Sequence, residues 1–277
     1  MLDNILGHDK IKEQLKSDLS ESKVSHAYLF SGIEGVGKKT LAIEFAKALL
    51  KTEYLDACID YKYIEKLPDK KEIVVEQVRN KIVNDVYVAP ATGSYKVYII
   101  NDAHLLNAAA QNALLKTLEE PPKYVVIILI TNNEKALLTT VLSRVKNINF
   151  NRLSDEQIEV LLKEKYNEEI SSNRLNYANG SLKVAFELVN EQDNKYEKLD
   201  ELYRCYKKKD MLQAMKQIEQ ISFKDDETFN YLAYLFMQDN LYDKIPVIEK
   251  ARNRMKQNAS EDMVKQALNI YLMKGGG

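Results

Sequence analysis

The first 150 residues alternate between short apolar runs and segments whose apolar side chains recur at helical spacing. Two of the runs are rich in β-branched residues without polar alternation, which is typical of strands buried on both faces of a sheet. Strands are predicted at Ala27–Ser31, Lys96–Ile100, Tyr124–Thr131 and Asn147–Phe150. Helices are predicted around Ile11, Leu15 and Leu19, at Thr40–Leu50 and at Ala108–Leu118. This order predicts an α/β domain with a parallel sheet.

From Leu153 onward only helical spacing remains, and no further strand is expected. Ser154 and Gln157 have the spacing of a capping box at a helix start. Ala178–Ser181 interrupts the helices, and Asn190–Lys195 is a polar stretch typical of a linker. We therefore predict three domains: an α/β domain at 1–152, a small helical domain at 153–192 and a C-terminal helical domain at 193–277.

Bulk composition narrows the class of protein. The net charge is −1, with 40 basic and 41 acidic side chains, whereas a protein that grips DNA through its phosphates usually has a basic excess. The N-terminus lacks a secretion signal, and no run of 18 apolar residues is present, so we expect a cytoplasmic protein without a membrane span. Cys58 and Cys205 lie far apart and indicate neither a disulfide framework nor a metal cluster.

A glycine-rich loop, Gly32–Thr40, follows the first predicted strand and opens a helix, as a phosphate-binding P-loop requires. Gly32, Gly35 and Gly37 allow backbone N–H groups to turn inward around phosphate oxygens, and Lys38 can reach the terminal phosphates. The loop is therefore predicted to bind the phosphates of ATP or ADP.

The residue after Lys38 departs from the P-loop pattern. A Ser or Thr hydroxyl normally ligates Mg²⁺ there, but this chain has Lys39, whose ammonium has no lone pair for a metal. Thr40 cannot replace it, because one helical residue turns a side chain by about 100° and advances it by about 1.5 Å. We expect nucleotide binding without efficient Mg²⁺-dependent hydrolysis, and we predict no metal site.

A second position that supports metal chemistry is also altered. After the strand Lys96–Ile100, an ATPase site places Asp and then Glu, but this chain has Asn101 and Asp102. Asn101 is a weaker partner for a hydrated cation, and Asp102 is one methylene shorter than Glu. The alternative interpretation is that both residues cap the following helix.

Several strings together resemble the clamp-loader family of bacterial DNA polymerase III, and within it the delta-prime subunit. They are His26–Phe30 before the P-loop, Ala113–Pro122 (ALLKTLEEPP), Leu142–Val145 (LSRV), Gly180–Ala185 and, near the C-terminus, Arg252 with Asn258. The resemblance spans nearly the whole chain. It implies an AAA+ P-loop domain with a small helical lid and a C-terminal helical collar for oligomerisation. Many relatives carry four zinc-binding cysteines after the P-loop helix, but residues 50–72 contain only Cys58, so zinc is not expected.

The resemblance also assigns roles to single residues. In the family, ATP sites lie at the boundaries of a five-membered ring, and Arg144, in the Ser143-Arg144 motif, would act as an arginine finger in the next subunit's site. The alternative is a surface arginine in a salt bridge. Asn132 and Lys183 occupy the positions of two nucleotide sensors; alternatively, both are ordinary surface residues or relics.

The function implied is that of a stator-like subunit in a hetero-pentamer with gamma/tau and delta subunits. Such a subunit helps to place the sliding clamp on primed DNA and contacts that DNA only indirectly. It belongs to a DNA polymerase holoenzyme but has little or no ATPase activity of its own. Two alternatives remain open: an ATP-hydrolysing motor subunit of the same family, and a free-standing nucleotide-binding regulator.

Overall fold

The structure is a computed structural model of the 277-residue chain, and it describes residues 2, 5–21, 23–190 and 194–273. The chain divides into two compact units. The first comprises Met1–Asn167 and Gly180–Lys183, and the second comprises Glu168–Asn179 and Val184–Gly277. The domain boundaries at residues 152 and 192 stay predictions, and the second of them lies outside the described residues.

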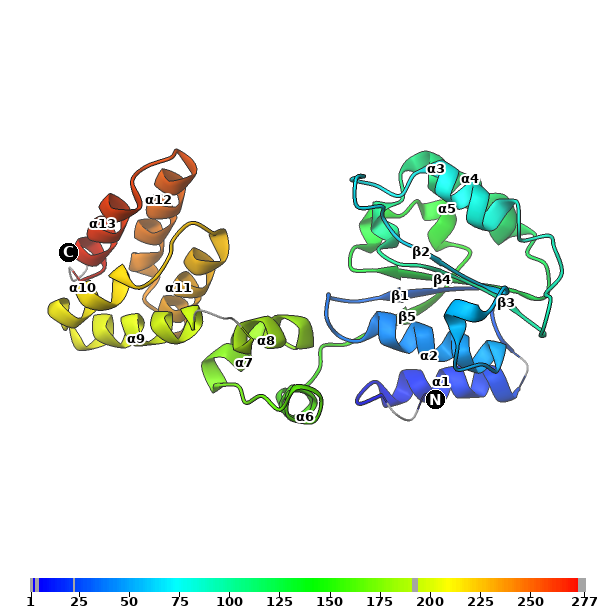
Figure 1. The fold of residues 1–277 in the computed structure, drawn as a ribbon, viewed down its shortest axis with the longest axis horizontal. Helices are drawn as coiled ribbons and strands as arrows, with labels where there is room; N and C mark the ends of the chain where they lie inside the picture. The colour runs from blue at the N-terminus through cyan, green and yellow to red at the C-terminus, as the bar shows by residue number, and fades with distance from the viewer. Residues whose placement is uncertain (1, 3–4, 22, 191–193, 274–277) are drawn as a thin grey trace. The chain divides into compact units, whose positions relative to one another are not determined.

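The first unit is built on a five-stranded parallel sheet in the order β2-β3-β4-β1-β5 (Figure 1). The strands are β1 (Ala27–Ser31), β2 (Tyr61–Ile64), β3 (Lys96–Ile100), β4 (Val125–Thr131) and β5 (Lys146–Asn149). In the register, Tyr28 of β1 pairs with Ile128 of β4 on one side and Lys146 of β5 on the other. The predicted parallel α/β fold is confirmed, and β2 is a strand that the sequence analysis did not predict.

Helices cover both faces of the sheet (Figure 1). One face packs against α1 (Asp9–Ser20) and α2 (Lys38–Leu50), and the other packs against α3 (Val75–Val78), α4 (Ala108–Glu119) and α5 (Thr139–Leu142). Alternate residues of each strand enter the two cores: Tyr28 and Phe30 join the α1–α2 side, whereas Leu29 joins the α3–α5 side. Burial on both faces explains why the sequences of β1, β3 and β4 are nearly continuous apolar runs.

Local sequence signals fix several element ends. The predicted capping box is confirmed at the start of α6 (Asp155–Tyr166): Ser154 Oγ accepts from the Gln157 N–H at 3.3 Å, and Gln157 Oε1 accepts from the Ser154 N–H at 3.0 Å. Helix α2 begins at Lys38 instead of Thr40, because Gly37 already occupies the N-cap with φ 97°. The helix that contains Arg79 starts as α3 and continues as a π-helical turn at Arg79–Val83.

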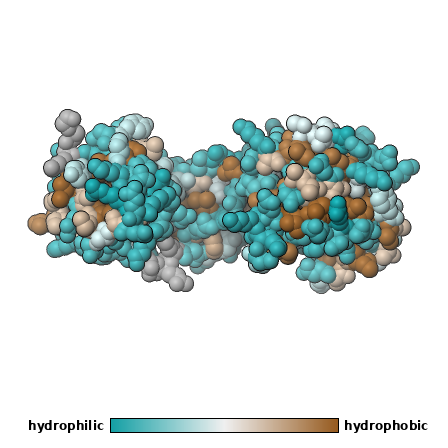
Figure 2. All heavy atoms as spheres, turned by 90° about the horizontal axis from the view of Figure 1, so that it is seen from above, coloured by the Kyte–Doolittle hydropathy of each residue, from teal (hydrophilic) through white to brown (hydrophobic). Residues whose placement is uncertain are grey.

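After β5 the described part of the chain is helical. The remaining helices are α7 (Ser172–Ala178), α8 (Leu182–Val189), α9 (Lys195–Lys208), α10 (Met211–Glu219), α11 (Asp226–Gln238), α12 (Ile245–Lys256) and α13 (Glu261–Met273). In the second unit, α9 packs against α10 and α11, while α13 packs against α10 and α12. On the face shown in Figure 2, hydrophilic residues cover most of both units and hydrophobic residues form smaller patches. Each helix within the described residues is too short or too polar to cross a lipid bilayer.

Candidate functional site

The loop between β1 and α2 has the backbone conformation of a phosphate cradle. Gly32, Gly35 and Gly37 all have positive φ, of 147°, 82° and 97°. A Cβ on Gly37 would meet nothing within 4 Å, so this backbone faces open space. The N-terminus of α2 follows directly, and its free N–H groups favour an anion. The loop therefore fits a phosphate group.

The Lys38 ammonium group points into the loop. The residue is only 7% exposed, and Nζ donates to the carbonyl oxygens of Gly32 at 2.8 Å and Ile33 at 2.6 Å. Burial lowers the pKa of Lys38, while the nearby carboxylates of Glu34 and Asp102 raise it. The ammonium is thus held at the base of the cradle by the chain's own backbone.

Lys39 points toward β2. Its Nζ lies 4.8 Å from the centre of the Tyr63 ring, which is a cation–π geometry. Burial, followed by the charges of Glu65 and Asp102, raises the pKa of Tyr63, so its hydroxyl stays neutral. Lys39 and Tyr63 together supply a cation and an aromatic face, and neither is a ligand that Mg²⁺ prefers.

Asn101 and Asp102 lie at the carboxyl end of β3. Asn101 Nδ2 donates to Asp102 Oδ2 at 2.9 Å. Asp102 occupies the cap position of the short helical turn Ala103–Leu105 with φ 50°, but its side chain makes no capping hydrogen bond. The alternative interpretation of Asp102 as a cap is therefore wrong. One carboxylate remains near the loop, and a neutral amide engages it.

Residues 180–183, which belong to the first unit, close over the outer turn of the loop. Ser181 Oγ donates to the Glu34 carbonyl at 2.8 Å, and the Leu182 N–H donates to the Gly35 carbonyl at 3.1 Å. Lys183 Nζ pairs with Glu34 Oε1 at 2.6 Å. A Cβ on Gly35 would collide with Ser181 and Lys183, so only glycine permits this approach. Lys183, predicted at a sensor position, engages a loop carboxylate here.

A small cavity lies beside the loop. Its volume is about 70 Å³, and it is lined mainly by apolar side chains: Ile5, Leu6, Val36, Leu153, Leu161 and Leu182, with Gly35, Gly37, Thr40 and Lys165. A cavity of about 150 Å³ holds one benzene molecule. This cavity is therefore smaller than one that holds a single aromatic ring, and the Lys39 ammonium and the neutral Asn101 amide do not suit a magnesium ion.

The sheet topology separates Arg144 from the other predicted site residues. The P-loop, Asn101 and the exposed Asn132 all follow the carboxyl ends of parallel strands and share one edge of the sheet. Arg144 precedes β5 at the opposite, amino edge. Because Lys146 pairs with Tyr28, four residues before Gly32, the start of β5 lies about 13 Å from the level of the loop.

Contacts within the chain hold the Arg144 side chain, which is 33% exposed. Nη1 donates to the Thr140 carbonyl at 2.8 Å and to Ser143 Oγ at 3.1 Å, and Nη2 pairs with Glu119 Oε1 at 2.8 Å. The surface salt bridge named as the alternative to an arginine finger is thus present. Its partner carboxylate is 49% exposed, so the pair is of the weak, exchangeable kind.

Sequence reasoning missed three residues of the site: Glu34, Tyr63 and Ser181. The signal for Tyr63 is the short run Tyr61–Ile64, which is only four residues long. Glu34 stands between two loop glycines, and its position carries no signal for the pairing with Lys183. Ser181 contacts the loop across 147 residues of sequence, a relation that spacing cannot reveal.

Comparisons with known proteins indicate a family. Residues 7–154 match the family described as DNA polymerase III, delta subunit. The DNA polymerase III subunit gamma of Buchnera aphidicola subsp. Schizaphis graminum is 33% identical over 208 residues, which are 67% of this chain and 56% of that protein. The DNA polymerase III subunit tau of Bacillus subtilis is 34% identical over 194 residues, covering 66% of this chain and 34% of the relative.

A solved structure supports the fold over most of the chain. A DNA polymerase III gamma subunit-related protein from Thermotoga maritima superimposes with a TM-score of 0.56 at 18% identity, covering 94% of this chain and 98% of that chain. The chain spans between a third and just over half of the two curated relatives above. Since the family match covers more than half of the chain, the chain belongs to the DNA polymerase III delta-subunit family and is a clamp-loader family member with an AAA+ fold.

Proposed function

We propose that this chain is a stator-like, delta-prime-type subunit of the clamp loader, which lends Arg144 to the ATP site of a neighbouring subunit. The observation that carries the proposal is the position of Arg144 at the amino edge of the sheet, while the chain's own phosphate loop lies at the carboxyl edge. A guanidinium on that edge cannot serve its own loop, and its planar fork suits phosphate oxygens of another subunit.

The chain's own loop acts as scaffold in this proposal. Gly32, Gly37 and Lys38 would hold the phosphates of ATP or ADP through backbone N–H groups and one ammonium. Lys39 brings a cation where a metal-bound hydroxyl belongs, so water activation at a magnesium centre is not supported. Lys183 would contact the nucleotide only after the Lys183–Glu34 ion pair opens, and Asn132 would contact it from the carboxyl end of β4.

The proposed partners follow from the family. Relatives of this chain are named gamma and tau subunits of DNA polymerase III. We propose that the chain joins such subunits and a delta subunit in a cytoplasmic hetero-pentamer, with residues 193–277 as the collar. The sliding clamp and primed DNA would be contacted through this assembly.

An ATP-hydrolysing motor subunit is the second candidate. Two observations favour it: the relatives are gamma and tau subunits, and the loop glycines and Lys38 are present. Lys39, Asn101 and the closure by residues 180–183 oppose it. A free-standing regulator, the third candidate, has no structural observation in its favour.

Reconstitution with the gamma/tau and delta subunits of the same organism tests the proposal. We expect co-elution in gel filtration and little phosphate release from the isolated chain, with rapid ATP turnover only in the assembly. Turnover by the isolated chain that Lys38→Ala abolishes would establish the motor alternative. If the chain did not co-elute with the other subunits, the free-standing regulator would be the remaining candidate.

A further inference from the structure

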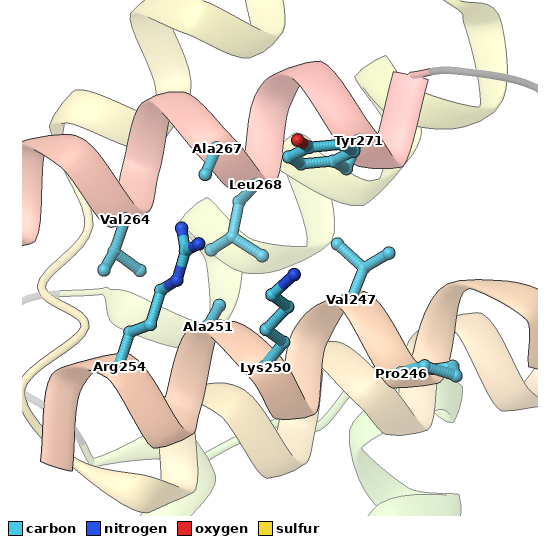
Figure 3. A pocket seen from close by; sticks show the side chains of 9 residues that line it. All are labelled: Pro246, Val247, Lys250, Ala251, Arg254, Val264, Ala267, Leu268 and Tyr271. Atoms are coloured by element: carbon cyan, nitrogen blue, oxygen red, sulfur yellow. The ribbon is translucent and has the colours of Figure 1, made fainter. Parts of the chain in front are cut away.

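A groove with an apolar floor runs between α12 and α13 of the second unit (Figure 3). Its volume is about 190 Å³. The floor consists of aliphatic side chains from both helices: Val247, Ala251, Val264, Ala267 and Leu268. Since about 150 Å³ holds one benzene molecule, the groove can accept one bulky apolar side chain.

Two cations stand at the rim of this groove. Lys250 and Arg254 lie one turn apart on α12, and both residues are exposed (Figure 3). Neither forms an ion pair with a carboxylate in the part of the chain that the structure describes. In contrast, Arg252 and Lys256 on the same helix both pair with Asp226. The positive charge beside the groove is therefore left unneutralised by this chain.

From this combination we infer that the α12–α13 groove binds an acidic amphipathic helix of another protein. One large apolar side chain of that helix enters the groove, and carboxylates one turn apart on it pair with Lys250 and Arg254. The match is geometric, because residues at i and i+4 on facing helices share a spacing of about 6 Å. Helix-in-groove recognition of this kind uses an apolar anchor with charges at its rim.

Two other occupants fit less well. A nucleic acid would use the cations and could stack a base on Tyr271, but it would gain nothing from the aliphatic floor. A second copy of this chain offers an exposed apolar stripe on α10, in which Leu212 is 75% and Met215 is 47% exposed. That stripe is flanked by Lys208, Lys209 and Lys216, whose charges repel Lys250 and Arg254. The inference concerns the second unit alone and does not depend on the role of Arg144.

Selection from a random 16-residue peptide library displayed on phage, with the whole chain as target, tests the inference. We expect enriched peptides to share one aromatic or leucine anchor and acidic residues at helical spacing. Synthetic copies, measured by fluorescence anisotropy, should bind the Lys250→Glu/Arg254→Glu double variant at least tenfold more weakly. The matched control, Lys216→Glu on α10, should bind them as wild type does. Ala267→Trp, which fills the groove, should abolish binding, and circular dichroism would verify that each variant is folded.

Any of four results would overturn the inference. Selected peptides without acidic residues, or with equal affinity for the double variant, would contradict the charge match. Binding of an oligonucleotide that the double variant loses, without any peptide enrichment, would identify a nucleic-acid surface. Self-association in analytical ultracentrifugation that the double variant loses would identify a second copy as the occupant.

Discussion

The two edges of the sheet treat positive charge differently. At the carboxyl edge, three cations are engaged by groups of the chain itself: Lys38 by loop carbonyls, Lys39 by the Tyr63 ring and Lys183 by Glu34. At the amino edge, Arg144 is held by one carbonyl, one hydroxyl and a half-exposed carboxylate.

The difference is clear for Lys38 and Arg144, and it lies in how easily each can be released; the exposed Lys183–Glu34 pair does not share the burial of Lys38. Lys38 is buried, and moving it would leave two part-buried backbone carbonyls without a donor; a fully buried group left unsatisfied costs about 1–3 kcal/mol, which is the upper bound for each. The exposed Arg144–Glu119 pair contributes about 0.2–1 kcal/mol, so a phosphate can displace the carboxylate. The P-loop can therefore keep a structural role, while the Arg144 guanidinium is available to contact phosphate in another subunit.

Replacing Arg144 should produce the largest effect. In the assembled loader, Arg144→Ala should slow ATP turnover by tenfold or more, as removal of arginine fingers does. Arg144→Lys should not restore the rate, because an ammonium lacks the planar fork. The exposed Arg79→Ala serves as the matched control and should turn over normally. A normal rate with Arg144→Ala would refute the finger.

Restoring the metal-supporting residues should sharpen the contrast between the edges. Lys39→Thr combined with Asn101→Asp should make ATP bind about tenfold more tightly with magnesium than without it, a difference of about 1.4 kcal/mol. The control Lys39→Ala removes the ammonium without supplying a hydroxyl and should show no such dependence. Calorimetry would measure the ATP affinity of both variants with and without magnesium. Magnesium-independent binding by the double variant would contradict the claim that Lys39 prevents magnesium binding.

Two glycines of the same loop test the closure by residues 180–183. Gly35→Ala forces a Cβ against Ser181 and Lys183, whereas a Cβ on Gly37 meets open space. Both changes carry the backbone strain of positive φ, about 1–2 kcal/mol. Urea unfolding should therefore show a larger loss for Gly35→Ala than for Gly37→Ala. Equal losses would argue that the segment does not close on the loop.

The smallest expected effect concerns pH. Burial lowers the pKa of His8, against the opposing effect of the Val36 carbonyl, 2.7 Å from Nε2. A histidine whose folded-state pKa is depressed stabilises the fold fully above its unfolded pKa of about 6.5, and that stability is lost as pH falls through the lowered value. Thermal melts between pH 7.5 and 5 should thus fall less steeply for His8→Gln than for wild type. Parallel slopes would contradict this role.

The sequence predicted those parts of the fold whose signal is local. Strands β1 and β3 were predicted residue for residue, because strands buried on both faces are uninterrupted apolar runs. Strand β2 was missed, because Lys62 interrupts its apolar residues and the strand is only partly buried at the edge of the sheet. Helical spacing predicted that the chain after Leu153 is helical but could not show that Leu212 and Met215 of α10 stay exposed, because exposure depends on which helices pack nearby.

The site was predictable to a similar extent. Motif spacing located the loop, and topology then separated Arg144 from it, as parallel strands require. Contacts between distant segments were not predictable. The contact of Lys39 with the Tyr63 ring and the hydrogen bond from Ser181 to the loop form only when segments distant in the sequence pack together.

The central claim is that the chain's own loop serves as scaffold and not as an ATPase. A calorimetric titration of the isolated chain with ATP, with and without magnesium and with phosphate release recorded alongside, tests it most directly. We predict that any affinity measured is the same in both conditions and that no phosphate is released. Magnesium-dependent tightening accompanied by turnover, both lost in Lys38→Ala, would contradict the claim.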